Sequence, residues 1–181
     1  KYGLAKELLQ PLLPWFRETN YCGPVQVTAA MHNGKWHVLE YNIRLGVTCG
    51  AMVLRLLEKP IENLWEVVNN RQPDIRFNSD ALFGCSLTLA GIGYPFVAVT
   101  GPPLPIRVSE PFDCDVWWNE VAVDDNDEMI MTGHRLADVV AFGRTLDEAI
   151  SSAYKNIKKI HCVSSYYRTD IGQSLWPPGN T

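Results

Sequence analysis

The chain has 181 residues, of which 46% are hydrophobic and 20% are charged, and its formal net charge is −4. This composition is typical of a globular protein that buries a core in one domain or in two small ones. The acidic balance and the lack of a basic run argue against nucleic acid as a partner. No apolar run reaches the length of a membrane span and no signal-peptide pattern opens the chain, so we expect no membrane partner.

The cysteines indicate a reducing compartment. Five are present, scattered along the chain and never spaced as Cys-x-x-Cys: Cys22, Cys49, Cys85, Cys114 and Cys162. An odd number without paired spacing favours free thiols over a disulfide framework or a zinc site. We therefore expect a cytoplasmic protein.

The first part of the chain predicts helices and one strand pair. A leucine-rich pattern predicts a helix over the first twenty residues, interrupted at Pro11 and Pro14. The dipeptide Asn33-Gly34 is a hairpin signal between two runs of strand-forming residues. The expected elements after the first helix are strands at 24–31 and 36–43, helices at 50–58 and 61–69, and a turn at 71–74. Because the chain opens at Lys1 and not at a methionine, we expect it to be part of a longer protein.

The second part predicts mostly strands, closed by one helix. The expected strands are 84–90, 96–99, 116–123, 129–132 and 136–142, with a proline-rich loop at 101–105 and an acidic hairpin tip at 124–128. Thr145 followed by Glu148 is a capping box that opens a helix over 145–160. The sequence thus predicts an α+β fold with two parts, 1–78 and 79–181.

One strand carries the residues best suited to chemistry. Side chains alternate along a strand, so Glu40, Asn42 and Arg44 are predicted to project from one face. Carboxylate and amide oxygens suit Mg²⁺, and a guanidinium suits an oxyanion. The competing interpretation is a half-exposed strand end whose polar residues face solvent, which one-sided antiparallel strands commonly show.

Ordered motifs along the chain resemble the C-terminal half of the phosphoribosylamine–glycine ligase family, which belongs to the ATP-grasp superfamily. The segment Glu40-Tyr41-Asn42-Ile43-Arg44-Leu45-Gly46 is similar to the family's Glu-(Phe/Tyr)-Asn-x-Arg-Phe-Gly. Further similar segments are Gly93-Tyr94-Pro95, Thr132-Gly133-His134-Arg135-Leu136, the 143–154 helix region and Tyr167-Arg168-Thr169-Asp170-Ile171-Gly172. Each motif is weak alone, and their shared order is what makes the resemblance specific.

The resemblance implies an ATP-dependent ligase of purine biosynthesis. It implies that residues 1–78 are the C-terminal half of an ATP-grasp domain and that 79–181 form the family's small β-rich C-terminal domain. ATP and Mg²⁺ (or Mn²⁺) would be the cofactors, with Glu40 and Asn42 as metal and nucleotide-site residues. Arg44 would hold the glycine carboxylate or its acyl phosphate, which phosphoribosylamine then attacks. The lid and substrate domain would lie in the missing N-terminal part of the same protein, without which the fragment is expected to be inactive.

One departure from the family keeps other interpretations open. Where the family continues Asp-Pro-Glu-Thr, this chain has Val47-Thr48-Cys49-Gly50, so two acids are lost. The substrate could therefore differ from that of the family, which makes a divergent ATP-grasp ligase the second hypothesis. A non-catalytic module that reuses the fold for association or regulation is the third.

Overall fold

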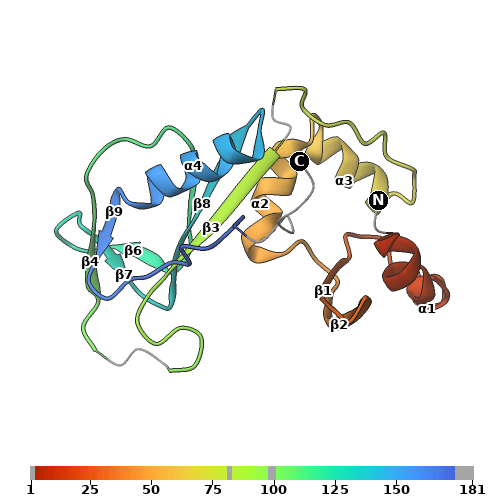
Figure 1. The fold of residues 1–181 in the computed structure, drawn as a ribbon, viewed down its shortest axis with the longest axis horizontal. Coiled ribbons are helices and arrows are strands. Elements are labelled where there is room, and N and C mark those ends of the chain that lie inside the picture. The colour runs from red at the N-terminus through yellow and green to blue at the C-terminus, as the bar shows by residue number, and fades with distance from the viewer. Residues whose placement is uncertain (1–2, 81–82, 98–100, 174–181) are drawn as a thin grey trace. The chain divides into compact units, whose positions relative to one another are not determined.

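The computed structural model describes residues 3–80, 83–97 and 101–173. It confirms a mixed fold of helices and antiparallel sheets (Figure 1). The chain divides into two compact units. The first unit comprises the chain up to Gly50 together with Leu57–Arg76, and the second comprises Ala51–Leu56 together with the chain from Phe77 onward. In the part of the chain that the structure describes, no helix is both long and apolar enough to cross a bilayer.

The first unit opens with a helical segment that changes type at its prolines, as predicted. A π-helix at Ala5–Leu9 is followed by a 3₁₀ turn at Gln10–Leu12 and by helix α1 at Leu13–Glu18. Proline lacks the backbone N–H that a helix interior needs, so it is tolerated only near the start of each piece.

A two-stranded antiparallel ribbon follows, and it carries the predicted hairpin turn. Strand β1 is Gln26–His32 and strand β2 is Lys35–Asn42. Asn33 and Gly34 have φ values of 49° and 73°, the conformation that a two-residue hairpin of the primed type requires. Thr28 pairs with Glu40 but Ala29 pairs with Val38, which leaves Leu39 as a bulge. The bulge breaks the strict alternation that the sequence predicted along this strand.

Two helices follow the ribbon along the chain, and the first of them is divided between the two units. Helix α2 spans Val47–Leu56 and helix α3 spans Pro60–Val68. Helix α2 begins three residues earlier than predicted because Gly46 is extended and its carbonyl oxygen accepts the first helical hydrogen bond, from the Gly50 amide at 2.7 Å. Pro60 occupies the first position of α3, where its missing N–H costs nothing.

The second unit contains two antiparallel sheets, helix α4 and the Ala51–Leu56 part of α2 (Figure 1). A three-stranded sheet has the order β3-β8-β5 and a four-stranded sheet has the order β6-β7-β4-β9. The strands are β3 Phe83–Ala90, β4 Leu104–Val108, β5 Asp115–Trp118, β6 Val121–Val123, β7 Met129–Met131, β8 Arg135–Gly143 and β9 Ile160–Cys162. Helix α4, Leu146–Ile157, packs against β3 and β8.

Helix α4 begins as predicted and forms one side of the core. The Thr145 hydroxyl accepts from the Glu148 amide at 3.2 Å, while the Glu148 carboxylate accepts from the Thr145 amide, which completes the capping box. Ala149, Ala153 and Ile157 are fully buried on its inner face. They pack in one cluster with buried apolar residues of β3 and β8.

Three predicted boundaries in the second unit were wrong. The proline-rich segment is not all loop, because β4 includes Leu104 and Pro105, and Pro105 lies where β9 does not yet pair with β4. The predicted strand 116–123 is split between β5 and β6, whose partners are in different sheets. Of the strand expected at 96–99, Phe96 and Val97 lie outside any strand and the last two residues lie outside the described residues.

Candidate functional site

Two of the three predicted site residues lie side by side at the end of β2. Asn42 Nδ2 lies 2.9 Å from Glu40 Oε1, and Thr28 Oγ1 on β1 donates to the same carboxylate oxygen at 3.4 Å. The antiparallel register explains this arrangement, because Thr28 pairs with Glu40 and Gln26 with Asn42. Glu40 is exposed and Asn42 is half-buried, so the pair is open to a ligand.

The third residue, Arg44, is placed differently from the prediction. Strand β2 ends at Asn42, so Arg44 lies beyond the pleat that was expected to align it with the other two. Its guanidinium Nη1 donates to the carbonyl oxygen of Leu45 at 3.0 Å. No hydrogen bond in the described part of the chain joins it to Glu40 or Asn42, and its side chain is exposed.

Glu40 and Asn42 bring together a carboxylate and an amide, and the oxygens of both groups suit Mg²⁺. The 2.9 Å contact between them is an ordinary hydrogen bond from Asn42 Nδ2 to Glu40 Oε1. Rotation of the amide would turn Oδ1 of Asn42 toward a bound cation. The pair would thus supply two ligands, while residues 3–80, 83–97 and 101–173 contain no group of three or more His, Cys, Asp or Glu side chains placed to hold a metal.

Neutral side chains surround the segment where the family's acids are lost. Cys49 Sγ lies 3.4 Å from Gln26 Oε1, and both side chains approach Gly46 so closely that a Cβ there would collide with them. Cys49 is half-buried in the first turn of α2, with a glutamine and not a histidine as its partner. This supports a lining role for Cys49 over a nucleophilic one, since an amide partner cannot act as the base that would activate the thiol.

A second cluster in the other unit joins two motifs that are far apart in the sequence. Arg135 Nη2 donates to the Tyr94 hydroxyl at 2.9 Å, and the guanidinium lies 5.6 Å from the centre of the Tyr94 ring. The backbone amides of His134 and Arg135 both donate to the Glu120 carboxylate. Arg135 Nε is buried without an acceptor. Reasoning from residue chemistry missed this cluster, and its signal was the pair of family-like segments that contain Tyr94 and Arg135.

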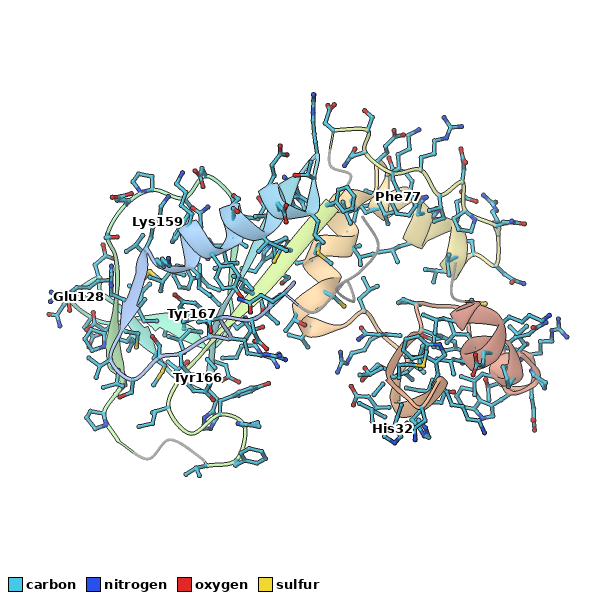
Figure 2. The ribbon with its side chains drawn as sticks, in the orientation of Figure 1. His32, Phe77, Glu128, Lys159, Tyr166 and Tyr167 are labelled. Atoms are coloured by element: carbon cyan, nitrogen blue, oxygen red, sulfur yellow. The ribbon has the colours of Figure 1, made fainter. Side chains whose placement is uncertain are left out.

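The acidic segment 124–128 is a self-contained turn, as predicted. Asp124 Oδ1 accepts from the amides of Asn126 and Glu128, both at 2.9 Å, and these hydrogen bonds lower the pKa of Asp124. Figure 2 labels Glu128 at this tip. The Asp124 carboxylate is thus already engaged by the backbone of its own turn.

Comparisons with known proteins agree with the motifs. Residues 84–174, half of the chain, match the family model described as phosphoribosylglycinamide synthetase, C domain. The chain is 29% identical over 180 residues to the phosphoribosylamine–glycine ligase of Fusobacterium nucleatum, an alignment that covers 96% of this chain and 42% of that protein. It is 27% identical to the enzyme of the same name from Corynebacterium ammoniagenes, covering 94% of this chain and 41% of that protein.

A solved structure supports the fold. The phosphoribosylamine–glycine ligase of Thermotoga maritima superposes with a TM-score of 0.66 at 24% identity, over 81% of this chain and 36% of that chain. This chain thus spans about two fifths of the length of the curated relatives that it matches. The motifs, the family model and the shared fold lead to one conclusion: the chain belongs to the phosphoribosylglycinamide synthetase C-domain family.

Proposed function

We propose that this chain is the C-terminal part of an ATP- and Mg²⁺-dependent ligase that joins glycine to phosphoribosylamine in purine biosynthesis in the cytoplasm. The observation that carries this proposal is the Glu40–Asn42 pair, in which a carboxylate and an amide, both with oxygens that suit Mg²⁺, contact each other at the end of β2. It stands within a chain whose curated relatives bear the name phosphoribosylamine–glycine ligase. On this proposal, residues 1–78 are half of an ATP-grasp domain and 79–181 are the C-terminal domain.

Each residue of the site has a role that follows from its chemistry. Glu40 and Asn42 would hold the cation, and Thr28 orients the Glu40 carboxylate by donating to it. Bound ATP with its cation supplies the phosphoryl group that activates a carboxylate for attack by an amine. Arg44, whose Nη1 donates to the carbonyl oxygen of Leu45, has further N–H groups for the glycine carboxylate. The partner required for turnover is the N-terminal part that the longer relatives contain.

A second candidate is a ligase of the same type with another substrate. The observation that favours it is the neutral segment after Gly46. Val47 and Cys49 stand where the family has acids one and three positions after that glycine, and the contact that Cys49 makes is with the neutral side chain of Gln26. A carboxylate there could orient an amino group or a hydroxyl, and neither valine nor cysteine replaces its charge. The cation site is unaffected by this difference, so the two candidates share one metal test and differ in substrate.

Paramagnetic broadening by Mn²⁺ tests the metal site, because it reports on cation binding by this chain without requiring turnover. Mn²⁺ is added to the ¹⁵N-labelled chain, and the broadening of each amide signal is measured. We expect the signals of residues 28 and 40–42 to broaden first, and Glu40→Gln to abolish this broadening while the fold is kept. Glu62→Gln, an exposed glutamate in the first turn of α3, is the matched control and should leave it unchanged.

The same variants are then placed in the longer gene product, where Mg²⁺-dependent ATP binding is measured by calorimetry. Binding that Glu40→Gln removes and Glu62→Gln retains supports a ligase site, and glycine-dependent phosphate release with phosphoribosylamine distinguishes the first candidate from the second. If the longer protein binds no nucleotide, both ligase hypotheses are wrong, and the hypothesis of a non-catalytic module remains.

A further inference from the structure

The first unit has almost no interior of its own. Among the described residues, Leu8 is the single buried apolar side chain that belongs to the first unit, and the other buried apolar side chains all belong to the second. Burial of apolar side chains is the main favourable contribution to folding. The second unit therefore has a core that can hold it together, whereas the first unit leaves most of its apolar side chains at its surface.

Helix α3 presents one apolar stripe to solvent, formed by Ile61, Trp65 and Val68 (Figure 1). These side chains are 72%, 65% and 69% exposed, and their spacing of four and three residues places them on one face of the helix. The opposite face is anchored, because Asn63 is 6% exposed and its Nδ2 donates to the Asp74 carbonyl oxygen at 3.1 Å. The helix therefore cannot turn the α3 stripe inward without breaking this contact.

The β1–β2 ribbon of the same unit is also uncovered. In the described part of the chain, β1 and β2 pair only with each other, so each strand has one edge whose backbone groups are unpaired. A two-stranded ribbon is marginally stable in water by itself. Leu39 and Ile43, at and beyond the end of the regular pairing, are 67% and 57% exposed. Single exposed apolar residues are ordinary, but a helix stripe together with an open ribbon indicates a surface that another part of a protein covers.

The length of the relatives argues for what covers this surface. The chain aligns over 96% of its own length with 42% of the Fusobacterium nucleatum ligase, so more than half of that protein has no counterpart here. Because residues 84–174 match the C domain, the part without a counterpart would precede the chain and join it at the first unit. A covalently attached surface is present at a high effective concentration, whereas a second copy has to be recruited from solution.

We propose that the α3 stripe is a docking surface for the N-terminal part of the longer protein. An apolar surface of that part would cover Ile61, Trp65 and Val68, and the first unit would complete its core only when the part is attached. The inference rests on the proposed function in one respect, because it takes this chain as the C-terminal part of a longer protein. It uses neither the cation pair nor the nucleotide, so the two proposals can fail separately.

The experiment compares this chain with the longer gene product by hydroxyl-radical labelling and mass spectrometry. The oxidation rate of Trp65 reports the exposure of its ring. We expect Trp65 to be oxidised severalfold more slowly in the longer protein than in this chain at the same molar concentration. Equal rates in the two proteins would overturn the proposal. Protection of Trp65 in this chain that grows with concentration would also overturn it, because a second copy would then be the occupant.

Two matched valine variants give an independent measurement. Val68 in the stripe and Val123 at the end of β6 are 69% and 61% exposed, so Val68→Ser and Val123→Ser remove similar side chains from similar surroundings in this chain. In the longer protein, we expect Val68→Ser to lower the thermal unfolding midpoint more than Val123→Ser does, because only Val68 becomes buried. In this chain alone, the two variants should behave alike. Equal shifts from both variants in the longer protein would contradict docking at the stripe.

Nucleotide binding by the longer protein separates this inference from the proposed function. If ATP binds while Trp65 remains as exposed as in this chain, the docking surface is wrong and the ligase site is supported. If Trp65 is protected while no nucleotide binds, the docking surface is supported and the ligase function is wrong.

Discussion

Asn156 is the residue whose removal should most clearly weaken the second unit. It is fully buried on α4, and its side chain makes four hydrogen bonds. Oδ1 accepts from the Asp113 amide at 3.1 Å and from Lys159 Nζ at 3.0 Å. Nδ2 donates to the Ser152 carbonyl oxygen at 2.9 Å and to the Asp113 carboxylate. The substitution Asn156→Ala removes the group that connects the loop at Asp113 to the helix.

The expected cost follows from what the substitution leaves behind. Each net hydrogen bond contributes about 1 kcal/mol, and a buried group left without its partner costs about 1–3 kcal/mol. Lys159 is only 8% exposed, and after the substitution its ammonium group keeps only the Pro111 carbonyl oxygen, at 2.7 Å, among these partners. Lys159 is labelled in Figure 2. We expect a loss of about 4 kcal/mol, which is a large part of the 5–15 kcal/mol that stabilises a typical domain.

The assay must report on the second unit alone. Tryptophan fluorescence would mix the two units, because Trp15, Trp36 and Trp65 lie in the first and Trp117 and Trp118 in the second. Hydrogen exchange measured by mass spectrometry on peptides from α4 and β8 avoids this and gives the local free energy of unfolding. The control is Asn126→Ala, an exposed asparagine of the same unit whose side chain makes one long hydrogen bond of 3.4 Å.

The control variant Asn126→Ala gives the change in stability that an ordinary surface substitution causes. Surface substitutions of this kind change stability by about 0.5 kcal/mol or less, so Asn126→Ala should leave the exchange of α4 nearly unchanged. If Asn156→Ala costs less than about 1 kcal/mol, the network does not hold the loop to the helix and the reasoning from its hydrogen bonds is refuted.

Two further predictions concern titratable groups. The pKa of Asp113 is lowered to about 2 by hydrogen bonds from Lys155 and Asn156, so the native state binds fewer protons than the unfolded chain between about pH 5 and pH 2. The urea midpoint should therefore fall as the pH is lowered from about 5 to 2, and less steeply in Asp113→Asn; an unchanged slope would contradict this cause. Burial raises the pKa of the Cys114 thiol to about 11 and also raises that of Cys85. Iodoacetamide at pH 8 should label the exposed Cys22 before either, as a mass-spectrometric time course would show, and early labelling of Cys114 would refute the assignment.

Signals from residues next to each other in the sequence predicted most helices and strands. The strand boundaries that were predicted wrongly depend on pairing with strands far along the chain. The hairpin turn at Asn33-Gly34 and the capping box at Thr145 depend on residues next to each other, and both were predicted correctly. The sequence did not predict strand β4, because Pro105 lacks the backbone N–H that pairing between strands uses. Its pairing with β7 and β9, which lie far along the chain, outweighs that preference.

The candidate site was predictable only within one strand. Alternation correctly placed Glu40 beside Asn42, but it could not reveal that the strand ends before Arg44 or that Leu39 forms a bulge. The pairing of Arg107 with His161 was beyond prediction for a related reason. Arg107 and His161 become neighbours only through the pairing of β4 with β9, which the sequence did not indicate.

The strand order β3-β8-β5 of the three-stranded sheet has a consequence for how the second unit folds. Strand β8 continues almost directly into α4, so these two elements can meet with little loss of chain entropy. Strand β3 pairs with β8 across a long separation, as the hydrogen bond between Thr88 and Asp138, 50 residues apart, shows. Closing a loop of that length costs about 3 kcal/mol before the pairing stabilises it. Capture of β3 by a preformed β8–α4 pair is therefore the step that we expect to set the refolding rate, in the slow range of proteins rich in non-local contacts.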